Sequence, residues 1–160
     1  MLYFAYGSNL HHKQMKMRCR DSKYLGCYTL KGYRLFFRNH YYGGGVADVQ
    51  KKKNSYVLGA IYEISKRDEK KLDIYEQFPK TYIKKYFRLH GKKVMFYYMP
   101  KKTMHVPPSK RYLNIIIRGY KDCGYKETYI VISKNKKIKI KWKSTIVLCT
   151  SMKMWFWILD

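Results

Sequence analysis

The chain has 160 residues, which is enough for one domain with a buried core and too few for a second core. Its 35 Lys and Arg residues outnumber its 10 Asp and Glu residues, for a formal net charge of +25. One explanation of this charge is a surface that binds nucleic acid or an anionic membrane. The other is the composition of an AT-rich coding sequence, which is rich in lysine codons, because the lysines are spread along the whole chain.

The first half of the chain is predicted to consist mainly of β-strands. Apolar and aromatic residues recur over four short runs, at residues 2–6, 24–37, 46–49 and 56–64. Gly26 and Gly32 interrupt the second run, which is therefore either one long strand with bulges or two short strands. Gly59 in the fourth run allows another group to approach the strand closely.

Helical spacing of apolar residues appears in two places before residue 80. A short helix is expected near residues 10–18. Ser65 and Asp68 have the spacing of a capping box, so a longer helix begins there. This helix reaches about Tyr75 and turns Leu72 and Tyr75 towards the core.

The remaining elements are a hairpin and a third helix. Strands at about 82–89 and 93–99 are joined at Gly91. Ser109 begins the helix and Gly124 ends it. Because strands dominate and do not alternate regularly with helices, the sequence predicts an α+β fold with a single domain.

The cysteines and histidines predict neither a disulfide framework nor a metal site. The four cysteines include no C-x-x-C pair and no signal peptide precedes them, which favours a reduced, cytoplasmic setting. The five histidines lack metal-ligand spacing, and no nucleotide-binding loop or G-x-S-x-G motif occurs. We therefore expect no metal and no cofactor.

Three short motifs follow one another: Tyr-Gly-Ser-Asn at residues 6–9, Leu-Asp-x-x-Glu at 72–76 and Pro-Ser-x-x-Tyr at 108–112. The first is a strand ending in a turn whose backbone N–H groups can converge on a carboxylate or phosphate. In this order, with a tyrosine-bearing strand at 96–99 before the third motif, they resemble the gamma-glutamylcyclotransferase family. The resemblance covers residues 1–130 and leaves residues 131–160 as an atypical basic and apolar C-terminal segment.

The resemblance implies a fold and a reaction. The fold is a small mixed β-barrel with a few helices packed outside, and the substrate lies at one end of the barrel. In the reaction, the α-amine of a small γ-glutamyl amide attacks the side-chain carbonyl and closes a five-membered ring. This cyclisation releases 5-oxoproline with a free amine or amino acid, and it needs no cofactor or metal.

The resemblance makes Glu76 the catalytic residue. A base must take a proton from the α-amine and an acid must give one to the leaving nitrogen, and one carboxylate can do both. Glu76 lies near a predicted helix end, where the macrodipole disfavours an anion, and beside Tyr75, Phe78 and Tyr82. Both surroundings predict a raised pKa. Asp73 is expected to be a local hydrogen-bond acceptor.

The family's substrate-binding residues match a loop and two tyrosines of this chain. Backbone N–H groups of the loop would hold the α-carboxylate and the reacting carbonyl, the latter as an oxyanion hole. The tyrosine hydroxyls would line the pocket, and core packing explains each tyrosine equally well. The matching residues are Tyr6, Gly7, Ser8, Asn9, Leu10, Tyr98 and Tyr112.

Two features depart from the family pattern. Gln77 follows Glu76 where family members usually have a glycine that ends the helix, so the glutamate could be set differently. In the C-terminal segment, residues 137–143 alternate as in a strand with one lysine face, and the apolar run that follows is too short to span a membrane. That run is an edge strand over the barrel, an interfacial anchor around residues 155–157, or a tail that replaced the normal ending by frameshift.

A second function stays open beside the enzyme. A non-catalytic relative could use its basic, tyrosine-rich surface to bind nucleic acid or an acidic partner, with the barrel as a scaffold. The charge favours this alternative, and the three motifs favour the enzyme. Neither function specifies the leaving amine or an oligomeric state.

Overall fold

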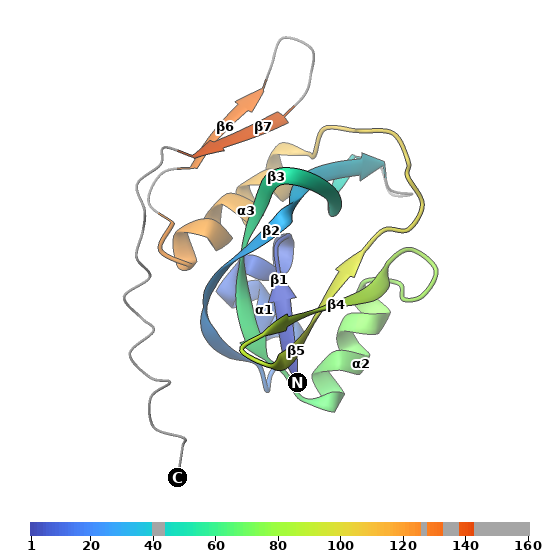
Figure 1. Ribbon diagram of the computed structural model, residues 1–160, viewed down its shortest axis with the longest axis vertical. Helices are drawn as coiled ribbons and strands as arrows, with labels where there is room; N and C mark the ends of the chain where they lie inside the picture. The colour runs from blue at the N-terminus through green and yellow to red at the C-terminus, as the bar shows by residue number, and fades with distance from the viewer. Residues whose placement is uncertain (40–43, 126–127, 133–137, 143–160) are drawn as a thin grey trace.

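The computed structural model describes residues 1–39, 44–125, 128–132 and 138–142, which form a mixed α+β domain (Figure 1). Its main sheet has five strands in the order β2-β3-β1-β5-β4, and β6 and β7 pair separately with each other. The strands are β1 (Leu2–Ala5), β2 (Lys23–Asn39), β3 (Gly45–Glu63), β4 (Ile83–Leu89), β5 (Lys92–Tyr98), β6 (Thr128–Ile132) and β7 (Ile138–Trp142). The helices are the 3-10 turn η1 (Ser8–Leu10), α1 (His12–Arg18), α2 (Lys66–Tyr75) and α3 (Lys110–Asp122).

β2 and β3 form a long antiparallel ribbon along one side of the sheet. Its register shifts twice, next to Gly26 and Gly32, whose φ angles of 142° and 78° suit glycine. The predicted bulges are therefore confirmed, and the run is one strand. β3 is also continuous, whereas the sequence predicts two strands. Residues 52–55 have a polar, loop-like composition and form a bulge in which Asn54 has a φ of 58°. The strand continues past them because Lys51 pairs with Tyr33 and Tyr56 pairs with Lys31.

The sheet is curled but not closed, so the expected barrel is not found. β1 lies at the buried centre, antiparallel to β3 and parallel to β5. β2 and β4 are the two edges, and no backbone pairing joins them among the described residues. Instead, Tyr28 of β2 stacks on Phe87 of β4, with ring centroids 5.2 Å apart. The two rings lie between the edge strands β2 and β4. In a closed barrel these strands would pair through their backbones at a spacing of about 4.8 Å.

The predicted helix caps and hairpin are confirmed. Ser65 Oγ accepts a hydrogen bond from Asp68 N (3.0 Å), and Ser109 Oγ accepts one from Tyr112 N (3.2 Å). β4 and β5 pair antiparallel across the turn at Gly91, whose φ is 75°. These local signals therefore fix where α2, α3 and the hairpin begin.

α3 ends as predicted, and its interior glycine has a packing role. Gly124 has a φ of 75°, and its N–H donates to the carbonyl of Lys121 (2.9 Å). Glycine has a low helix propensity, so Gly119 weakens α3, but its missing side chain lets another segment approach the helix closely. A Cβ at Gly119 would lie only 2.6 Å from His11 N, so α3 packs directly against the end of η1.

α2 buries Leu72 as predicted, but the prediction for Tyr75 is wrong. The side chain of Tyr75 is 47% exposed, whereas that of Leu72 is fully buried. Tyr75 turns away from the core because the guanidinium of Arg18 lies over its ring, 3.6 Å from the ring centroid. This contact brings the end of α1 beside the end of α2.

The C-terminal segment is described in part. β7 confirms the strand predicted at residues 137–143, and it pairs with β6, which crosses the expected boundary at residue 130. Residues 143–160, on which the edge-strand, anchor and frameshift alternatives depend, lie outside the described residues. In the part of the chain that is described, no helix has both the length and the apolar character needed to cross a membrane.

Candidate active site

Glu76 is the C-cap residue of α2, and Gln77 ends the helix in the manner of a glycine. Phe78 N donates to Asp73 O (2.8 Å) and Gln77 N to Ile74 O (3.2 Å), which are the two bonds of a left-handed C-terminal cap. Gln77 adopts the required left-handed conformation, with a φ of 52°. The absence of glycine therefore does not change how this helix ends.

Replacing Gln77 by glycine should raise the free energy of unfolding by about 0.5–1 kcal/mol. A left-handed residue with a Cβ costs about 1–2 kcal/mol, and the greater freedom of glycine in the unfolded chain offsets part of the gain. Loss of the 2.7 Å bond from Thr81 Oγ1 to Gln77 Oε1 offsets a further part. Urea unfolding measures the change. Gln77→Ala is the control, because it loses the same bond and keeps the strain, and a glycine variant less stable than this alanine variant would contradict the account.

The carboxylate of Glu76 is held by the loop motif. Asn9 Nδ2 donates to Glu76 Oε1 (3.0 Å) and to the hydroxyl of Tyr3 (2.9 Å). Burial raises the pKa of Glu76 to about 7, while the charge of Arg18 and the hydrogen bond from Asn9 act to lower it. The direction agrees with the sequence prediction, and burial is its main cause.

The loop of residues 6–10 is anchored at both ends. The hydroxyl of Tyr6 donates to the carbonyl of Tyr97 (2.7 Å) in the interior. Leu10 is fully buried, and its N–H donates to the carbonyl of Gly7 (3.0 Å). The side chain of Leu10 therefore anchors the loop in the core. The resemblance assigns Leu10 a different role, namely contact with the substrate.

The middle of this loop faces Arg18 and Glu76. Arg18 Nη1 donates to Ser8 Oγ (3.0 Å) and to Asn9 Oδ1. The backbone N–H groups of Ser8 and Asn9 have no acceptor among the described residues, as is usual in the first turn of a helix. These two donors can therefore bind an anion or a carbonyl oxygen.

Two tyrosines border the site on the side of β3. Tyr112 OH accepts a hydrogen bond from Ala47 N (3.2 Å), and Tyr82 OH donates to Ala47 O (2.7 Å). Burial raises the pKa of both tyrosines, and the negative charge of Glu76 raises each further, as expected for hydroxyls near that carboxylate. A Cβ on Gly7 would lie 3.2 Å from Ala47 Cβ, so glycine lets the loop pack against β3.

Tyr98 is the predicted pocket residue that the structure does not place against Glu76. It is half-buried, and Lys85 Nζ lies 5.0 Å from the centroid of its ring. No contact described for Tyr98 reaches Glu76 or residues 6–10. Successive residues of a strand face opposite sides, and the neighbouring Tyr97 is the one that points towards α2.

Asp73 is a hydrogen-bond acceptor, as predicted, but its partners are distant in sequence. The hydroxyl of Tyr97 donates to it from β5 (2.6 Å), and Lys84 Nζ donates from β4 (2.8 Å). Lys84 also pairs with Glu69 one turn earlier in α2 (2.7 Å). These bonds tie α2 to the sheet just before Glu76, which is a structural role.

Two residues of this site, Arg18 and Tyr3, are not predicted by any sequence motif. Both reach the carboxylate through Asn9, which lies six residues after one of them and nine before the other. No local motif marks either residue. Their role follows only from the turn at residues 6–10, which brings β1 and α1 together.

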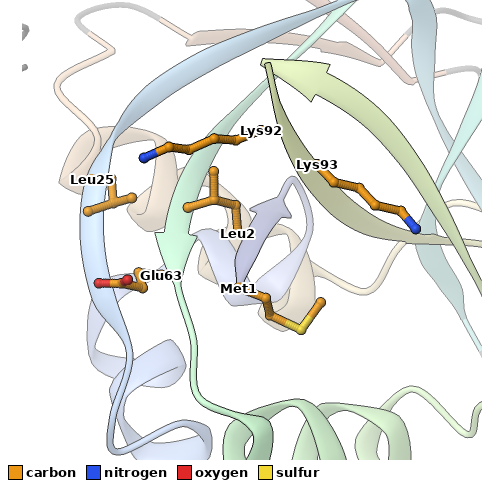
Figure 2. A pocket seen from close by; sticks show the side chains of 6 residues that line it. All are labelled: Met1, Leu2, Leu25, Glu63, Lys92 and Lys93. Atoms are coloured by element: carbon orange, nitrogen blue, oxygen red, sulfur yellow. The ribbon is translucent and has the colours of Figure 1, made fainter. Parts of the chain in front are cut away.

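A cavity of about 290 Å³ lies away from Glu76, at the N-terminal end of β1 (Figure 2). Its lining residues are Met1, Leu2, Leu25, Glu63, Lys92 and Lys93, none of which is a predicted site residue. β1 runs from this cavity to the loop of residues 6–10, so the two sites lie at opposite ends of one strand. The described part of the chain holds no group of three or more His, Cys, Asp or Glu side chains arranged for a metal ion.

Known proteins are similar to this chain in sequence and fold. The family model described as gamma-glutamyl cyclotransferase, AIG2-like, matches residues 3–114. The gamma-glutamylcyclotransferase of Mus musculus is 27% identical over 139 residues, which are 80% of this chain and 74% of that protein. The Homo sapiens protein of the same name is 28% identical over 134 residues, or 77% and 71% of the two chains. A solved gamma-glutamyl cyclotransferase superposes with a TM-score of 0.68 at 26% identity, over 78% of this chain and 80% of that one. The chain therefore belongs to the gamma-glutamyl cyclotransferase, AIG2-like, family.

Proposed function

We propose that this protein is a gamma-glutamylcyclotransferase, which releases 5-oxoproline and a free amine or amino acid from a γ-glutamyl amide. The hydrogen bond between Asn9 and Glu76 supports this most strongly. It joins the loop motif to the glutamate motif across 67 positions of sequence, at a 3.0 Å distance. The pKa of about 7 of the Glu76 carboxyl also supports the proposal, because it suits the proton carrier that the family resemblance assigns to this residue.

In this proposal Glu76 carries one proton through the reaction. The ionised carboxylate takes a proton from the α-amine nitrogen as that nitrogen bonds to the γ-carbonyl carbon. The carbonyl oxygen becomes an oxyanion, which accepts hydrogen bonds from the N–H groups of Ser8 and Asn9. The bond from this carbon to the leaving nitrogen then breaks, and Glu76 returns the proton to that nitrogen. The five-membered ring is complete, and the carboxylate is ionised again.

The other predicted binding residues take places around this centre. Tyr6, Gly7 and Tyr112 shape the pocket for the γ-glutamyl group, because they border the loop and Glu76. Tyr98, whose ring lies beside Lys85, has no role in this proposal.

Product analysis tests the proposal directly. Purified protein is incubated with γ-glutamyl-alanine or γ-glutamyl-lysine, and 5-oxoproline is measured by mass spectrometry. We expect release from at least one of these donors. Absence of 5-oxoproline with every γ-glutamyl donor tried would overturn the proposed reaction.

Activity should rise with pH through about 7, as Glu76 loses its proton. Because burial raises the pKa of Glu76 to about 7, most molecules at lower pH carry a protonated carboxyl that cannot act as a base. Below this value kcat/KM should fall about tenfold per pH unit. Initial rates at constant ionic strength measure the profile. A rate that is flat between about pH 5 and 8 would show that another group sets the protonation requirement.

A second candidate function, binding of single-stranded nucleic acid, has one specific observation in its favour. The centre of the β2–β3 ribbon carries five exposed cationic side chains: Lys31, Arg34, Lys51, Lys52 and Lys53. The ribbon segments 22–47 and 49–62 contain no Asp or Glu, so no carboxylate of these segments offsets this charge. Tyr56 is 48% exposed opposite Lys31 and presents a ring on which a base can stack.

Salt-dependent binding of an oligothymidylate tests this second function. Replacing Lys51, Lys52 and Lys53 together by glutamine should lower the slope of log affinity against log salt by about 2, at about 0.7 per phosphate contact. The control replaces three exposed lysines of α2 by glutamine: Lys66, Lys70 and Lys71. Both triple variants lose the same charge. Equal effects of the two variants, or no binding at about 50 mM salt, would exclude the ribbon as the binding surface.

A further inference from the structure

We propose that Arg18 is a positioning residue, which orients the side-chain amide of Asn9 and through it holds the carboxylate of Glu76 in place. Arg18 is the last residue of α1, where α1, η1 and α2 meet. Its guanidinium lies over the ring of Tyr75 and donates from Nη2 to the Tyr75 hydroxyl. Nη1 donates to the loop, at Ser8 Oγ and Asn9 Oδ1.

Arg18 decides which end of the Asn9 amide faces Glu76. An asparagine side chain has one acceptor oxygen and one donor NH₂ group. Because the oxygen accepts from Arg18, the NH₂ group is left to donate to Glu76 Oε1 (3.0 Å) and to Tyr3 OH (2.9 Å). In the reverse orientation the amide oxygen would face the carboxylate and the NH₂ group would face the guanidinium, and both contacts would be repulsive. A guanidinium, which only donates, therefore fixes the orientation.

Arg18 also supplies the positive charge that acts on Glu76. Among the described residues, the groups whose pKa values this carboxylate raises are tyrosines, and burial raises the same pKa values further, so these tyrosines are neutral near pH 7. These residues are Tyr3, Tyr6, Tyr82, Tyr97 and Tyr112. The charge of Arg18 holds the pKa of Glu76 below the value that burial alone would give. Arg18 thus keeps more of the carboxylate ionised near neutral pH.

Three substitutions separate orientation from charge. Arg18→Met removes both, so the titration of Glu76 should move up by at least about one pH unit. Arg18→Lys keeps the charge but not the planar fork, so the titration should stay near the wild-type value while kcat falls. Arg20→Met is the matched control, because Arg20 is exposed and close in sequence to Arg18, and its replacement removes the same charge. It should leave both quantities unchanged.

Carbon NMR of the full chain, with ¹³C-labelled glutamate, follows the Glu76 carboxyl directly, and Glu76→Gln assigns the signal. The proposal is overturned if Glu76 titrates at the same pH in Arg18→Met as in wild type, or if Arg20→Met shifts it equally. Should Arg18→Met not fold, Arg18→Gln replaces it, because glutamine removes the charge and still offers a donor to Asn9. The same upward shift is then expected, and no shift is the contrary result.

The kinetic test rests on the proposed function and is read separately. With a substrate that yields 5-oxoproline, Arg18→Met should lower kcat/KM about tenfold more at pH 6 than at pH 9. The lost orientation of Asn9 acts at every pH, whereas the lost charge lowers the ionised fraction of Glu76 only at the lower pH. A protein without activity would refute the proposed reaction and leave the NMR titration to decide on Arg18. An active enzyme whose pH profile is identical in Arg18→Met and wild type would refute the role of Arg18 alone.

Discussion

Glu76→Gln should lower kcat at least about 10³-fold and leave substrate binding nearly unchanged. Glutamine keeps the size of the side chain and can still accept the hydrogen bond from Asn9, but it cannot accept a proton. General acid–base groups contribute about 10²–10⁴-fold, and here one group serves both proton transfers. Steady-state kinetics on a γ-glutamyl substrate measure kcat and KM. Retention of activity within about tenfold of wild type would show that another residue carries the proton.

Stability measurements distinguish a chemical effect of this substitution from damage to the fold. Burial raises the pKa of Glu76 from 4.5 to about 7, so its contribution to stability is present below the unfolded-state pKa and is lost as pH rises through about 7. At pH 8 Glu76→Gln should therefore be at least as stable as wild type. Asp73→Asn is the control with the opposite pattern. It weakens the contacts to Tyr97 and Lys84, so it should lower stability more than kcat.

Arg38→Met should lower the free energy of unfolding by about 3–5 kcal/mol. Arg38 is 2% exposed and Asp48 is fully buried, and Arg38 Nε donates to the Asp48 carboxylate. Burial raises the pKa of Asp48, and the hydrogen bonds from Met99 N and Arg38 oppose this. Without the guanidinium, folding would bury either an unpaired carboxylate or a carboxyl forced to bind a proton. Urea unfolding, monitored by far-UV circular dichroism, measures the loss.

Two further variants show whether this loss comes from the unpaired charge. Arg38→Met combined with Asp48→Asn should recover more than half of the stability, because asparagine is neutral and can still accept from Met99 N (2.8 Å). Arg34→Met removes an exposed cation from the same strand and should cost less than about 1 kcal/mol. A double variant no more stable than Arg38→Met would instead point to the bond from Arg38 to Thr103 O (2.7 Å) as the main contribution.

The elements that could be predicted from the sequence are those set by a few neighbouring residues. Ser65 and Ser109 begin helices because a serine side chain can cap its own helix. Gly26 and Gly32 mark the bulges because a positive φ suits glycine. Glu76 is placed beside the loop of residues 6–9, as the order of the three motifs implies. Local chemistry and motif order were thus sufficient for the outline of the fold and for the proximity of Glu76 to the loop.

The features that could not be predicted depend on contacts between distant residues. Tyr75 has the spacing of a core residue, but Arg18 of another helix draws it to the surface. Leu10 continues a binding motif, yet α3 packs on it because Gly119 leaves the space. The open seam of the sheet depends on the Tyr28 and Phe87 rings, which lie in strands 59 positions apart in sequence. The spacing of residue types along the chain does not predict such contacts between distant residues.

The tyrosines around Glu76 limit which groups of the site can gain or lose a proton near neutral pH. Burial raises the pKa of each of them above its ordinary value of 10, so none releases a proton at neutral pH. An arginine guanidinium is not deprotonated in proteins. Among the described groups in contact with the carboxylate, Glu76 alone can therefore change its protonation near pH 7. A titration of the site should show one inflection of a single proton, and among these groups Glu76 is the one acceptor for a proton that leaves a bound amine.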